Sequence, residues 1–420
     1  MKEFKENEVI NMDDLKINKR LIMTPGPVSV DPRVSQAMSN SILGQFDYEF
    51  VDIMNQTMEL IRKSFLTKNQ WSFPIDGTSR AGLEAVISSI VKPGDDVLVP
   101  VIGRFGYLFA ELVTRAGGIV HSIYKPMGEV FEQSEIIEAL DQYQPKVLAI
   151  VHGETSTGRL QPIDQLGRAC KERGIYSVVD AVATYQGMVI PVDEWELDAV
   201  IGGAQKCLSI PSGITPITFN DRFSDAINAR KRVELGIRST ETTEQNHFIR
   251  SNYLDLTQLQ DYWSPKRLNH HTEATTSIYA LHTGLRLALS EGLKARAQRH
   301  TFHQEGLRSA LKALGLEIYG DESNEMKMVI CVNIPDGIDD IAFRDGLLKN
   351  YGIEIAGSFG ELKGKIWRIG IMGYAVQKQN ILTFLAAFAT HLISQSNIKN
   401  LDLETAIKTL VDHYDNNEIS

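Results

Sequence analysis

Short runs of β-branched residues alternate with amphipathic stretches between about residues 70 and 205. The runs predicted as strands are Asp96–Val101, Lys146–Val151, Tyr176–Val179 and Leu197–Ile201. Strands separated by helical patterns are typical of a mostly parallel sheet with helices packed on it. The pattern therefore predicts an α/β fold.

The stretch Thr78–Val91 is predicted to be an amphipathic helix of this fold. Its apolar residues recur three or four positions apart and so share one face: Ala81, Leu83, Val86, Ile87, Ile90 and Val91. Thr78 or Ser79 supplies a hydroxyl that suits the N-cap position. The sequence Lys-Pro-Gly-Asp-Asp at 92–96 ends the helix and turns the chain into the next strand.

A chain of 420 residues is longer than one hydrophobic core usually supports, so two domains are expected. Residues 1–20 are polar and predict an N-terminal arm. Residues 21–285 are assigned to a large ligand-binding domain and residues 286–420 to a smaller α+β domain, with a long helix from about Thr275 linking them. Residues 235–262 are polar and are predicted to be irregular.

The net charge of −10 argues against nucleic acid or an anionic membrane as partner, because both require a basic surface. There is no apolar signal segment at the N-terminus and no run of 18 apolar residues, so a cytoplasmic protein without membrane spans is predicted. The pair His270-His271 has no third ligand at a recognisable spacing, and the cysteines form no Cys-x-x-Cys motif. No metal site is therefore predicted.

Lys206 follows the predicted strand Leu197–Ile201 in the sequence Gly-Gly-Ala-Gln-Lys at 202–206. A lysine just beyond the end of such a strand can reach the crevice in which α/β sheets bind ligands. When its amine is partly desolvated, its pKa falls and it can form a Schiff base with a carbonyl compound. The alternative is an ordinary lysine in an exposed loop.

Asp180 ends a buried strand and precedes Lys206 by 26 residues, a spacing that fits one intervening helix and strand. Both side chains can therefore end at the same edge of the sheet. A buried carboxylate needs a cationic partner, and the protonated nitrogen of a pyridine ring is one. The alternative is an aspartate that caps a helix.

Three further segments carry groups that suit an anionic ligand. The turn at 77–79 combines backbone N–H groups, two hydroxyls and the positive end of a helix dipole. Residues 152–158 add hydroxyls after the strand Lys146–Val151. Arg368 lies inside an apolar, strand-like run and must find an anion, either a substrate carboxylate or a structural acidic residue.

Taken together, these segments resemble the class V aminotransferases, pyridoxal-phosphate (PLP) enzymes of fold type I, in the branch that includes the alanine–glyoxylate and serine–glyoxylate aminotransferases. The resemblance runs from about Leu21 to about Ser394. It is carried by Thr-Pro-Gly-Pro at 24–27, Gly-Thr-Ser-Arg at 77–80, His-Gly-Glu-Thr-Ser-Thr-Gly at 152–158, Val-Asp-Ala-Val at 179–182, Gly-Ala-Gln-Lys at 203–206, Asn-His-His-Thr at 269–272 and Trp-Arg-Ile-Gly at 367–370. It implies a PLP-dependent aminotransferase that acts as a homodimer with shared active sites.

The resemblance also implies which residues carry the chemistry. Lys206 matches the lysine that forms the Schiff base and shuttles protons, and Asp180 matches the partner of the pyridine nitrogen. Gly26 and Arg368 match the site of the substrate carboxylate. The residues that match the other cofactor contacts are Thr78, Ser79 and Gln205 at the phosphate, Thr272 of the other subunit at the same phosphate, Phe105 and Val182 on the two faces of the ring, and Thr155 near the ring oxygen.

Two positions depart from the usual pattern of the glyoxylate branch. Asn269 stands where a tyrosine often precedes His-His-Thr, and Gln45 lies in a second segment that borders the active-site mouth. A carboxamide complements a ureido group, whereas a small alkyl donor would leave it unpaired at about 1–3 kcal/mol. This combination resembles the ureidoglycine–glyoxylate aminotransferases of purine (allantoin) catabolism, whose reaction gives glycine.

Three other functions stay open at this point. Alanine or serine can serve as amino donor to glyoxylate in the same branch. A cysteine desulfurase needs a persulfide-forming cysteine on a mobile loop, and Cys331, inside an apolar run, does not suit that role. A PLP-binding protein without enzyme activity would not need Arg368 and the two carboxamides to converge on Lys206.

Overall fold

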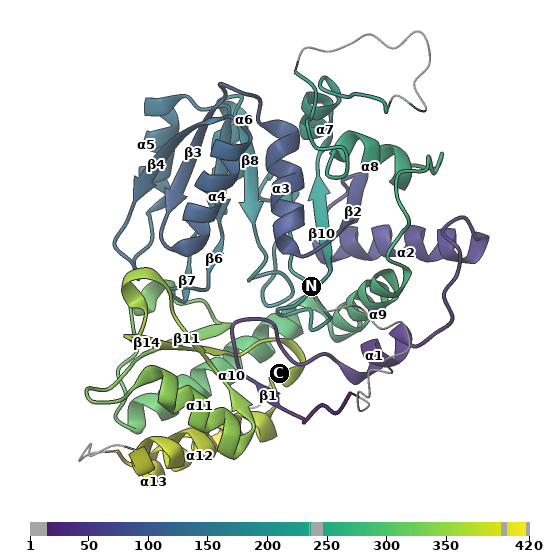
Figure 1. The fold of residues 1–420 in the computed structure, drawn as a ribbon. Coiled ribbons are helices and arrows are strands. Elements are labelled where there is room, and N and C mark those ends of the chain that lie inside the picture. The colour runs from purple at the N-terminus through teal and green to yellow at the C-terminus, as the bar shows by residue number, and fades with distance from the viewer. Residues whose placement is uncertain (1–14, 235, 237–246, 396–400, 417–420) are drawn as a thin grey trace, which may run out of the picture.

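The protein consists of a large sheet-containing unit and a smaller unit below it in Figure 1. This computed structural model describes residues 15–234, 236, 247–395 and 401–416. Most of the predicted N-terminal arm, residues 1–14, lies outside the described residues, and residues 15–20 are exposed coil.

Seven strands form the central sheet, in the order β2-β10-β9-β8-β5-β3-β4. All neighbouring pairs are parallel except the two made by β10 (Ile214–Phe219), which runs antiparallel to β2 and β9. The predicted α/β class with a mostly parallel sheet is confirmed. The other strands are β2 (Trp71–Asp76), β3 (Asp96–Val101), β4 (Ile119–Tyr124), β5 (Val147–Val151), β8 (Tyr176–Asp180) and β9 (Ala199–Ile201).

The central strands are covered on both faces. Every residue of β5 and β9 is buried, as expected where helices pack on both sides of a parallel sheet. A hairpin of two short strands, β6 (Gly153–Glu154) and β7 (Arg159–Leu160), follows β5. The helices of this unit are α1 (Pro32–Met38), α2 (Tyr48–Ser64), α3 (Ser79–Ile90), α4 (Arg104–Arg115), α5 (Gln133–Tyr143), α6 (Leu166–Glu172), α7 (Asp221–Asn228), α8 (Leu256–Trp263) and α9 (Thr275–Glu291).

The elements predicted from the hydrophobic pattern fall close to the observed ones. The four predicted strands coincide with β3, β5, β8 and β9 to within two residues, and the helix predicted over Thr78–Val91 is α3. The prediction that residues 235–262 are irregular was wrong in part, because α8 begins at Leu256. Asp255 accepts a hydrogen bond from the Thr257 N–H at its N-terminus, and most of its residues are buried against the large core. Residues 235 and 237–246 lie outside the described residues.

The smaller unit has its own sheet and its own hydrophobic cluster. Its antiparallel sheet has the order β11-β14-β13, formed by β11 (Val329–Asn333), β14 (Ile366–Gly370) and β13 (Ala356–Gly357). Its helices are α10 (Leu293–Ala313), α11 (Asp340–Tyr351), α12 (Lys378–Gln395) and α13 (Leu403–Asn416). Short 3-10 turns lie at Glu322–Asn324, Gly360–Leu362 and Gly373–Ala375.

The start of the described chain packs with this smaller unit. β1 (Leu21–Ile22) pairs in parallel with β12 (Ile353–Glu354), and Met23 belongs to the same hydrophobic cluster. The predicted boundary at 285/286 falls inside α9, whose Ala288 packs in the large core. The division into an arm and two domains stays a prediction.

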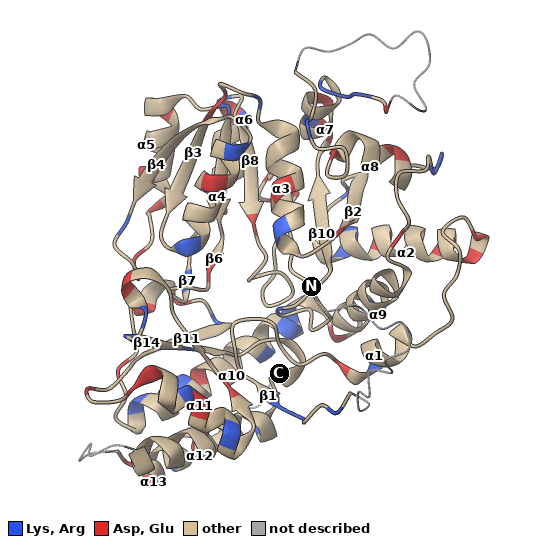
Figure 2. Ribbon diagram, in the orientation of Figure 1, with Lys and Arg blue, Asp and Glu red and all other residues tan. Residues whose placement is uncertain are grey.

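Charged residues of both signs are interspersed over both units in the view of Figure 2. Among the described helices, none is long and apolar enough to cross a membrane.

Candidate active site

A cavity of about 320 Å³ lies where the ends of the central strands meet the smaller unit. Its walls include loops that follow β5, β8 and β9, the start of α3, and residues 356–368 of the smaller unit. Its volume is at the lower end of the about 300–1,000 Å³ that small-molecule sites usually have. All the residues predicted for the site line this cavity, except Gln45, Asn269 and Thr272.

Lys206 projects into the cavity from a loop that only small residues allow. A Cβ atom on Gly203 would lie 2.3 Å from the carbonyl oxygen of Val182, so the loop passes directly over that residue. On the other side, Gly26 has a φ of +108°, and a Cβ there would lie 2.9 Å from Cγ of Lys206. The Lys206 side chain therefore packs against the backbone at Gly26, and it is buried, unlike an ordinary loop lysine.

The Lys206 amine is poised for chemistry that requires the neutral form. Its Nζ donates a hydrogen bond to Oγ1 of Thr155 at 3.5 Å and lies 5.5 Å from the ring centre of Phe105. Burial lowers the pKa of Lys206 to about 8, although the charge of Asp180 opposes this shift. An amine with this pKa has a substantial neutral fraction near neutral pH, which a nucleophile needs.

Asp180 ends β8 and presents a buried carboxylate to the cavity. The N–H of Val182 donates to its Oδ1 at 2.9 Å, while no hydrogen bond from a described residue reaches Oδ2. Burial raises the pKa of Asp180 to about 6, and the charge of Lys206 partly offsets this. One carboxylate oxygen thus remains available to a cationic N–H group in the cavity.

The N-terminus of α3 forms an anion-binding corner of the cavity. Thr78 is the N-cap residue, yet its hydroxyl makes no capping hydrogen bond to its own helix. Ser79 donates from Oγ to Oε1 of Gln205 at 3.2 Å, which ties the helix start to the loop that carries Lys206. Thr78, Ser79 and Arg80 all line the cavity, so unpaired N–H groups, a free hydroxyl and a positive charge meet there.

Glu154 positions the Phe105 wall of the cavity, and sequence analysis did not identify it as a site residue. Its Oε2 accepts the Phe105 N–H at 2.8 Å, and its Oε1 accepts the N–H and the hydroxyl of Ser156 at 3.0 and 2.5 Å. A Cβ on Gly103 would lie 2.4 Å from Cγ of Glu154, so α4 begins hard against this side chain. Burial raises the pKa of Glu154, which these hydrogen bonds oppose. The sequence shows Glu154 in the motif at 152–158, but it does not show that this side chain contacts Phe105 on α4.

Arg368 reaches the cavity from the buried strand β14. Its Nε donates to the Gly357 carbonyl at 2.7 Å and its Nη1 to the Thr155 carbonyl at 3.0 Å. Neither partner is an anion, and Arg368 forms no ion pair with any described acidic residue. The structural alternative considered for this arginine, a buried acidic partner, is therefore absent from the described part of the chain.

A second arginine, Arg104, lines the same cavity and was missed from the sequence. The Phe359 ring lies close to both guanidinium groups, with ring-centre distances of 4.1 Å to Cζ of Arg104 and 4.7 Å to Cζ of Arg368. The available signal was a basic residue directly before Phe105. Its relation to Arg368 depends on the packing of the two units, which the sequence does not reveal.

Gln45, Asn269 and Thr272 lie together at the surface, outside the cavity of their own chain. Nε2 of Gln45 donates to Oδ1 of Asn269 at 3.0 Å, and Oε1 of Gln45 accepts the N–H of Glu273 at 3.0 Å. Asn269 and Thr272 are exposed. The structure therefore brings the two carboxamides together, but not next to Lys206 of the same chain.

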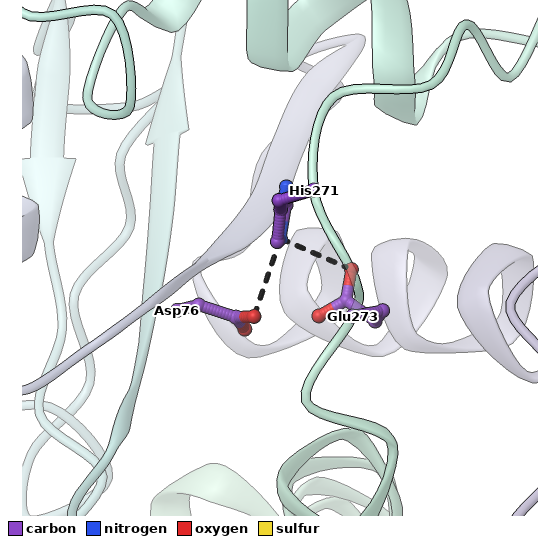
Figure 3. A group of neighbouring side chains, drawn as sticks. All are labelled: Asp76, His271 and Glu273. Carbon is purple, nitrogen blue, oxygen red and sulfur yellow. Dashed lines mark ion pairs between the residues drawn. The ribbon is translucent and has the colours of Figure 1, made fainter.

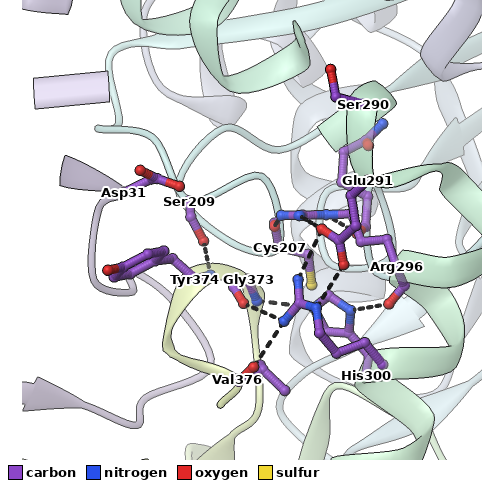
Figure 4. Close-up of polar contacts among 12 residues, drawn as sticks. Asp31, Cys207, Ser209, Ser290, Glu291, Arg296, His300, Gly373, Tyr374 and Val376 are labelled. Atoms are coloured by element: carbon purple, nitrogen blue, oxygen red, sulfur yellow. Dashed lines mark hydrogen bonds and ion pairs between the residues drawn. The ribbon is translucent and has the colours of Figure 1, made fainter. Parts of the chain in front are cut away.

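The loop after Lys206 is fixed to α10 by a cluster of polar contacts (Figure 4). Arg296 donates to the carbonyls of Cys207 and Gln186 and forms an ion pair with Glu291. Arg299 extends the cluster to the carbonyls of Gly373 and Val376 at 3.0 and 2.9 Å. These contacts hold the Lys206 loop in register with the smaller unit.

Comparison with known proteins identifies the family. Residues 33–364 match the family described as aminotransferase class-V. The chain belongs to this family. As a class V aminotransferase, it has PLP as its cofactor.

Relatives and solved structures agree with this assignment. The chain is 52% identical over 400 residues to the (S)-ureidoglycine–glyoxylate transaminase of Bacillus subtilis, covering 94% of this chain and 96% of that protein. It is 32% identical to the alanine–glyoxylate aminotransferase of Rattus norvegicus, over 87% and 86% of the two chains. The crystal structure of the Bacillus subtilis ureidoglycine–glyoxylate aminotransferase superposes with a TM-score of 0.90, at 50% identity, over 96% and 100% of the chains. An alanine–glyoxylate aminotransferase from Nostoc sp. gives a TM-score of 0.86 at 35% identity, over 93% and 99%.

The cavity fits the cofactor of this aminotransferase family. The uncapped start of α3 suits a phosphate, and the free Oδ2 of Asp180 suits a protonated ring nitrogen. Lys206 lies between them in the same cavity, with an amine of lowered pKa that suits a Schiff base. Donors and acceptors that suit the ring nitrogen, the phosphate and the aldehyde carbon of PLP therefore line one cavity of the chain.

Proposed function

We propose that this chain transfers the amino group of (S)-ureidoglycine to glyoxylate, forming glycine and the corresponding keto acid, in purine (allantoin) catabolism. The observation that carries the proposal is 52% identity to the Bacillus subtilis ureidoglycine enzyme, against 31–33% for the alanine–glyoxylate aminotransferases of six animals. The hydrogen-bonded carboxamides of Gln45 and Asn269 support it, because they offer the groups that a ureido substituent can pair with.

In this proposal Lys206 and Asp180 carry the chemistry. PLP, when bound, supplies an electron sink for the electron pair left at the donor's Cα. Lys206 would hold the cofactor through Nζ, and the same Nζ, when free, would move the Cα proton of the donor. Its lowered pKa suits this role, because a general base works best when its pKa lies near the operating pH. Asp180 accepts a hydrogen bond from the protonated ring nitrogen through Oδ2 and keeps that nitrogen cationic.

The remaining cavity residues position the cofactor. Thr78, Ser79 and Gln205 bind the phosphate at the start of α3. Phe105 and Val182 would pack against the ring, and Thr155, which contacts Lys206, would bind near the ring oxygen. None of these contacts changes the charge of the cofactor, so their role is to hold it in register for proton transfer.

Arg368 binds the carboxylate that ureidoglycine and glyoxylate have in common. Two of its nitrogens are fixed by the carbonyls of Gly357 and Thr155, which leaves N–H groups on the other side of the guanidinium for a substrate. Gly26 leaves room beside Lys206, because a side chain at this position would collide with the lysine stem. The same pair thus serves both half-reactions.

Gln45, Asn269 and Thr272 act in the neighbouring active site of a homodimer. Support comes from their place at the surface, outside the cavity of their own chain. The side chains next to Gln45 include Ile42 and Phe46, which are 72% and 60% exposed. Exposed apolar side chains beside polar groups are typical of a protein–protein contact.

We also propose that the dimer is cytoplasmic, and that residues 21–285 and 286–420 form its large and small domains.

The runner-up is an alanine– or serine–glyoxylate aminotransferase with the same cofactor contacts. A cysteine desulfurase is disfavoured by the thiols of this chain. Cys170, Cys207 and Cys331 are all buried, and burial raises the pKa of each to about 12, so none is a ready nucleophile.

A donor panel tests the proposal. The value of kcat/KM is measured with glyoxylate as acceptor and ureidoglycine, alanine or serine as donor. We expect ureidoglycine to exceed the others by at least about tenfold, because a site built to hydrogen-bond a substrate rejects analogues that lack those groups. A higher kcat/KM for alanine or serine would replace the proposal with the runner-up.

Two substitutions test whether the carboxamides of Gln45 and Asn269 determine which amino donor the enzyme prefers. Asn269→Tyr and Gln45→Ala should lower kcat/KM strongly for ureidoglycine, with little loss or a gain for alanine. Equal losses for both donors would mean that these residues serve the cofactor or the fold. Thr67→Ala is a control that should leave the ratio unchanged, because this half-buried threonine on the loop after α2 bonds Asp193 and does not line the cavity.

A further inference from the structure

Three side chains with metal-binding groups converge beside the Gly77–Ser79 turn, as Figure 3 shows. Asp76 is the last residue of β2, while His271 and Glu273 belong to the segment that leads into α9. Nε2 of His271 lies 3.2 Å from Oδ2 of Asp76 and 3.9 Å from Oε2 of Glu273. The three ligand atoms all lie within 4.8 Å of one another.

The hydrogen bonds around the histidine pair fix which nitrogen of His271 faces the carboxylates. Nε2 of His270 lies 3.2 Å from the Asn252 carbonyl, which can only accept, so this nitrogen carries a hydrogen. In the neutral imidazole the other ring nitrogen, Nδ1 of His270, is then an acceptor. That atom is 2.8 Å from Nδ1 of His271, which must then be the donor. In neutral His271, the lone pair on Nε2 therefore points at Asp76 and Glu273.

Glu273 adds a buried carboxylate with no partner of its own. Its side chain is only 1% exposed, and no hydrogen bond from a described residue reaches either of its oxygens. The hydroxyl of Tyr262 is buried nearby and is also unpartnered among the described residues. Two carboxylates and a nitrogen lone pair that face one another suit a cation held between them.

We propose that Asp76, His271 and Glu273 bind a divalent transition-metal ion of the zinc type. One imidazole nitrogen and two carboxylate oxygens are ligands that Zn²⁺ accepts, whereas Ca²⁺ and Mg²⁺ prefer oxygen alone. Tetrahedral coordination at bond lengths of about 2.0–2.2 Å places ligand atoms about 3.3–3.6 Å apart. The observed separations of 3.2 and 3.9 Å bracket this value, so small side-chain movements suffice.

The position of this ion gives it a structural role. None of its ligands lines the cavity of Lys206, so it takes no part in proton transfer there. It joins β2, which leads directly into the Gly77–Ser79 turn, to the segment that carries Asn269 and Thr272. The third ligand, Asp76, lies far from the histidine pair in the sequence, and for that reason the sequence predicted no metal. Here His270 orients His271, as a second hydrogen-bonding partner commonly does for a metal-bound histidine.

Metal analysis of the untagged holoenzyme tests the proposal. The protein is stripped with a chelator and titrated with Zn²⁺, or with Co²⁺ as a coloured probe. We expect about one ion per chain and a Tm that falls on stripping and recovers with Zn²⁺. His271→Asn and Glu273→Gln should lose this stoichiometric binding. His270→Phe, which removes only the orienting contact, should weaken affinity by about 10–100-fold.

Controls separate the site from the fold and from the cofactor. His282→Asn, at a histidine of α9 that bonds Gln56, should bind metal like the wild type. Circular dichroism and cofactor absorbance report whether each variant folds. Metal binding by the wild-type protein tests the proposal even if a variant does not fold. If the wild-type protein binds no Zn²⁺, Co²⁺ or Mn²⁺, a proton on Nε2 of His271 occupies the position proposed for the metal. If both ligand variants still bind one ion, the metal binds at another site. Either this result or the absence of binding in the wild-type protein overturns the proposal.

Discussion

The polar residues around Lys206 line a cavity, whereas those around Gln45 lie outside it at the surface. Lys206, Asp180 and Arg368 come from distant parts of one chain, yet all three line a single cavity and keep hydrogen-bonding groups free for a ligand. Gln45 and Asn269 pair with each other and lie outside that cavity. Within one chain, therefore, the residues proposed for the chemistry meet in a cavity, whereas those proposed to select the donor do not reach it.

Removing the amine of Lys206 should have the largest effect. Lys206→Ala leaves the phosphate corner and Asp180 in place, so the variant should still bind PLP weakly. Turnover should fall by about 10²–10⁴-fold or more, because the variant lacks the proposed general base. Steady-state rates measure this loss, and Lys63→Ala, an exposed lysine of α2, serves as control. Borohydride reduction followed by peptide mapping that labels a different lysine would contradict the assignment.

The next largest effect is expected for Asp180→Asn. The carboxamide keeps the shape and the hydrogen bond from Val182 but lacks the negative charge that keeps a ring nitrogen protonated. Deprotonation at the donor's Cα should slow by about 10²–10³-fold, with a smaller effect on folding. A donor deuterated at Cα reports whether this step limits the rate. Near-normal turnover in the variant would remove Asp180 from the mechanism.

Arg368→Lys tests the carboxylate site. Lysine keeps the positive charge but not the planar fork, and it cannot reach the Gly357 and Thr155 carbonyls while also binding substrate. We expect KM for the donor and for glyoxylate to rise by about 10–100-fold, the cost of losing a hydrogen bond to a charged group. The value of kcat should change less. An effect on only one of the two substrates would show that the two carboxylates bind at different places.

The pH dependence of cofactor attachment tests the environment of Lys206. Only the neutral amine attacks a carbonyl, and the pKa of Lys206 is lowered to about 8 by burial. The rate at which the apoenzyme takes up PLP should therefore rise about tenfold between pH 7 and pH 9 and then level off. A rate that keeps rising to pH 10 would indicate an ordinary exposed lysine. Because the native state binds this proton more weakly than the unfolded chain, Lys206 should also stabilise the apoenzyme as pH rises from about 8 toward the unfolded value.

The predicted fold class is confirmed, and most of the residues predicted for the site line one cavity, because both predictions rest on local patterns. Buried strands, glycines and the start of an amphipathic helix are visible in short segments. Asp180 ends such a strand, Lys206 follows one, and Thr78 begins the helix. The contacts that join distant elements were not visible. Glu154 holds α4 in place through Phe105, and Asp76 meets His271 only after the sheet has formed. The helix α8 was missed because its buried face is contributed by a short stretch within a polar region.

Hybrid dimers test whether the segment at 269–272 acts across subunits, with the smallest expected effect. Thr272→Glu places a negative charge where the proposal puts the phosphate of the partner's cofactor, so this variant and Lys206→Ala should each be inactive alone. In a heterodimer of the two, one site carries both defects and the other carries neither. Random mixing through a denaturation and refolding step gives about half heterodimers, so about a quarter of the wild-type sites should be intact. If Thr272 acted within its own chain, every heterodimer site would carry one defect and mixing would restore no activity. Recovery of about a quarter of the wild-type rate therefore requires a shared active site. If no activity is recovered, Thr272 does not act in the active site of the other subunit.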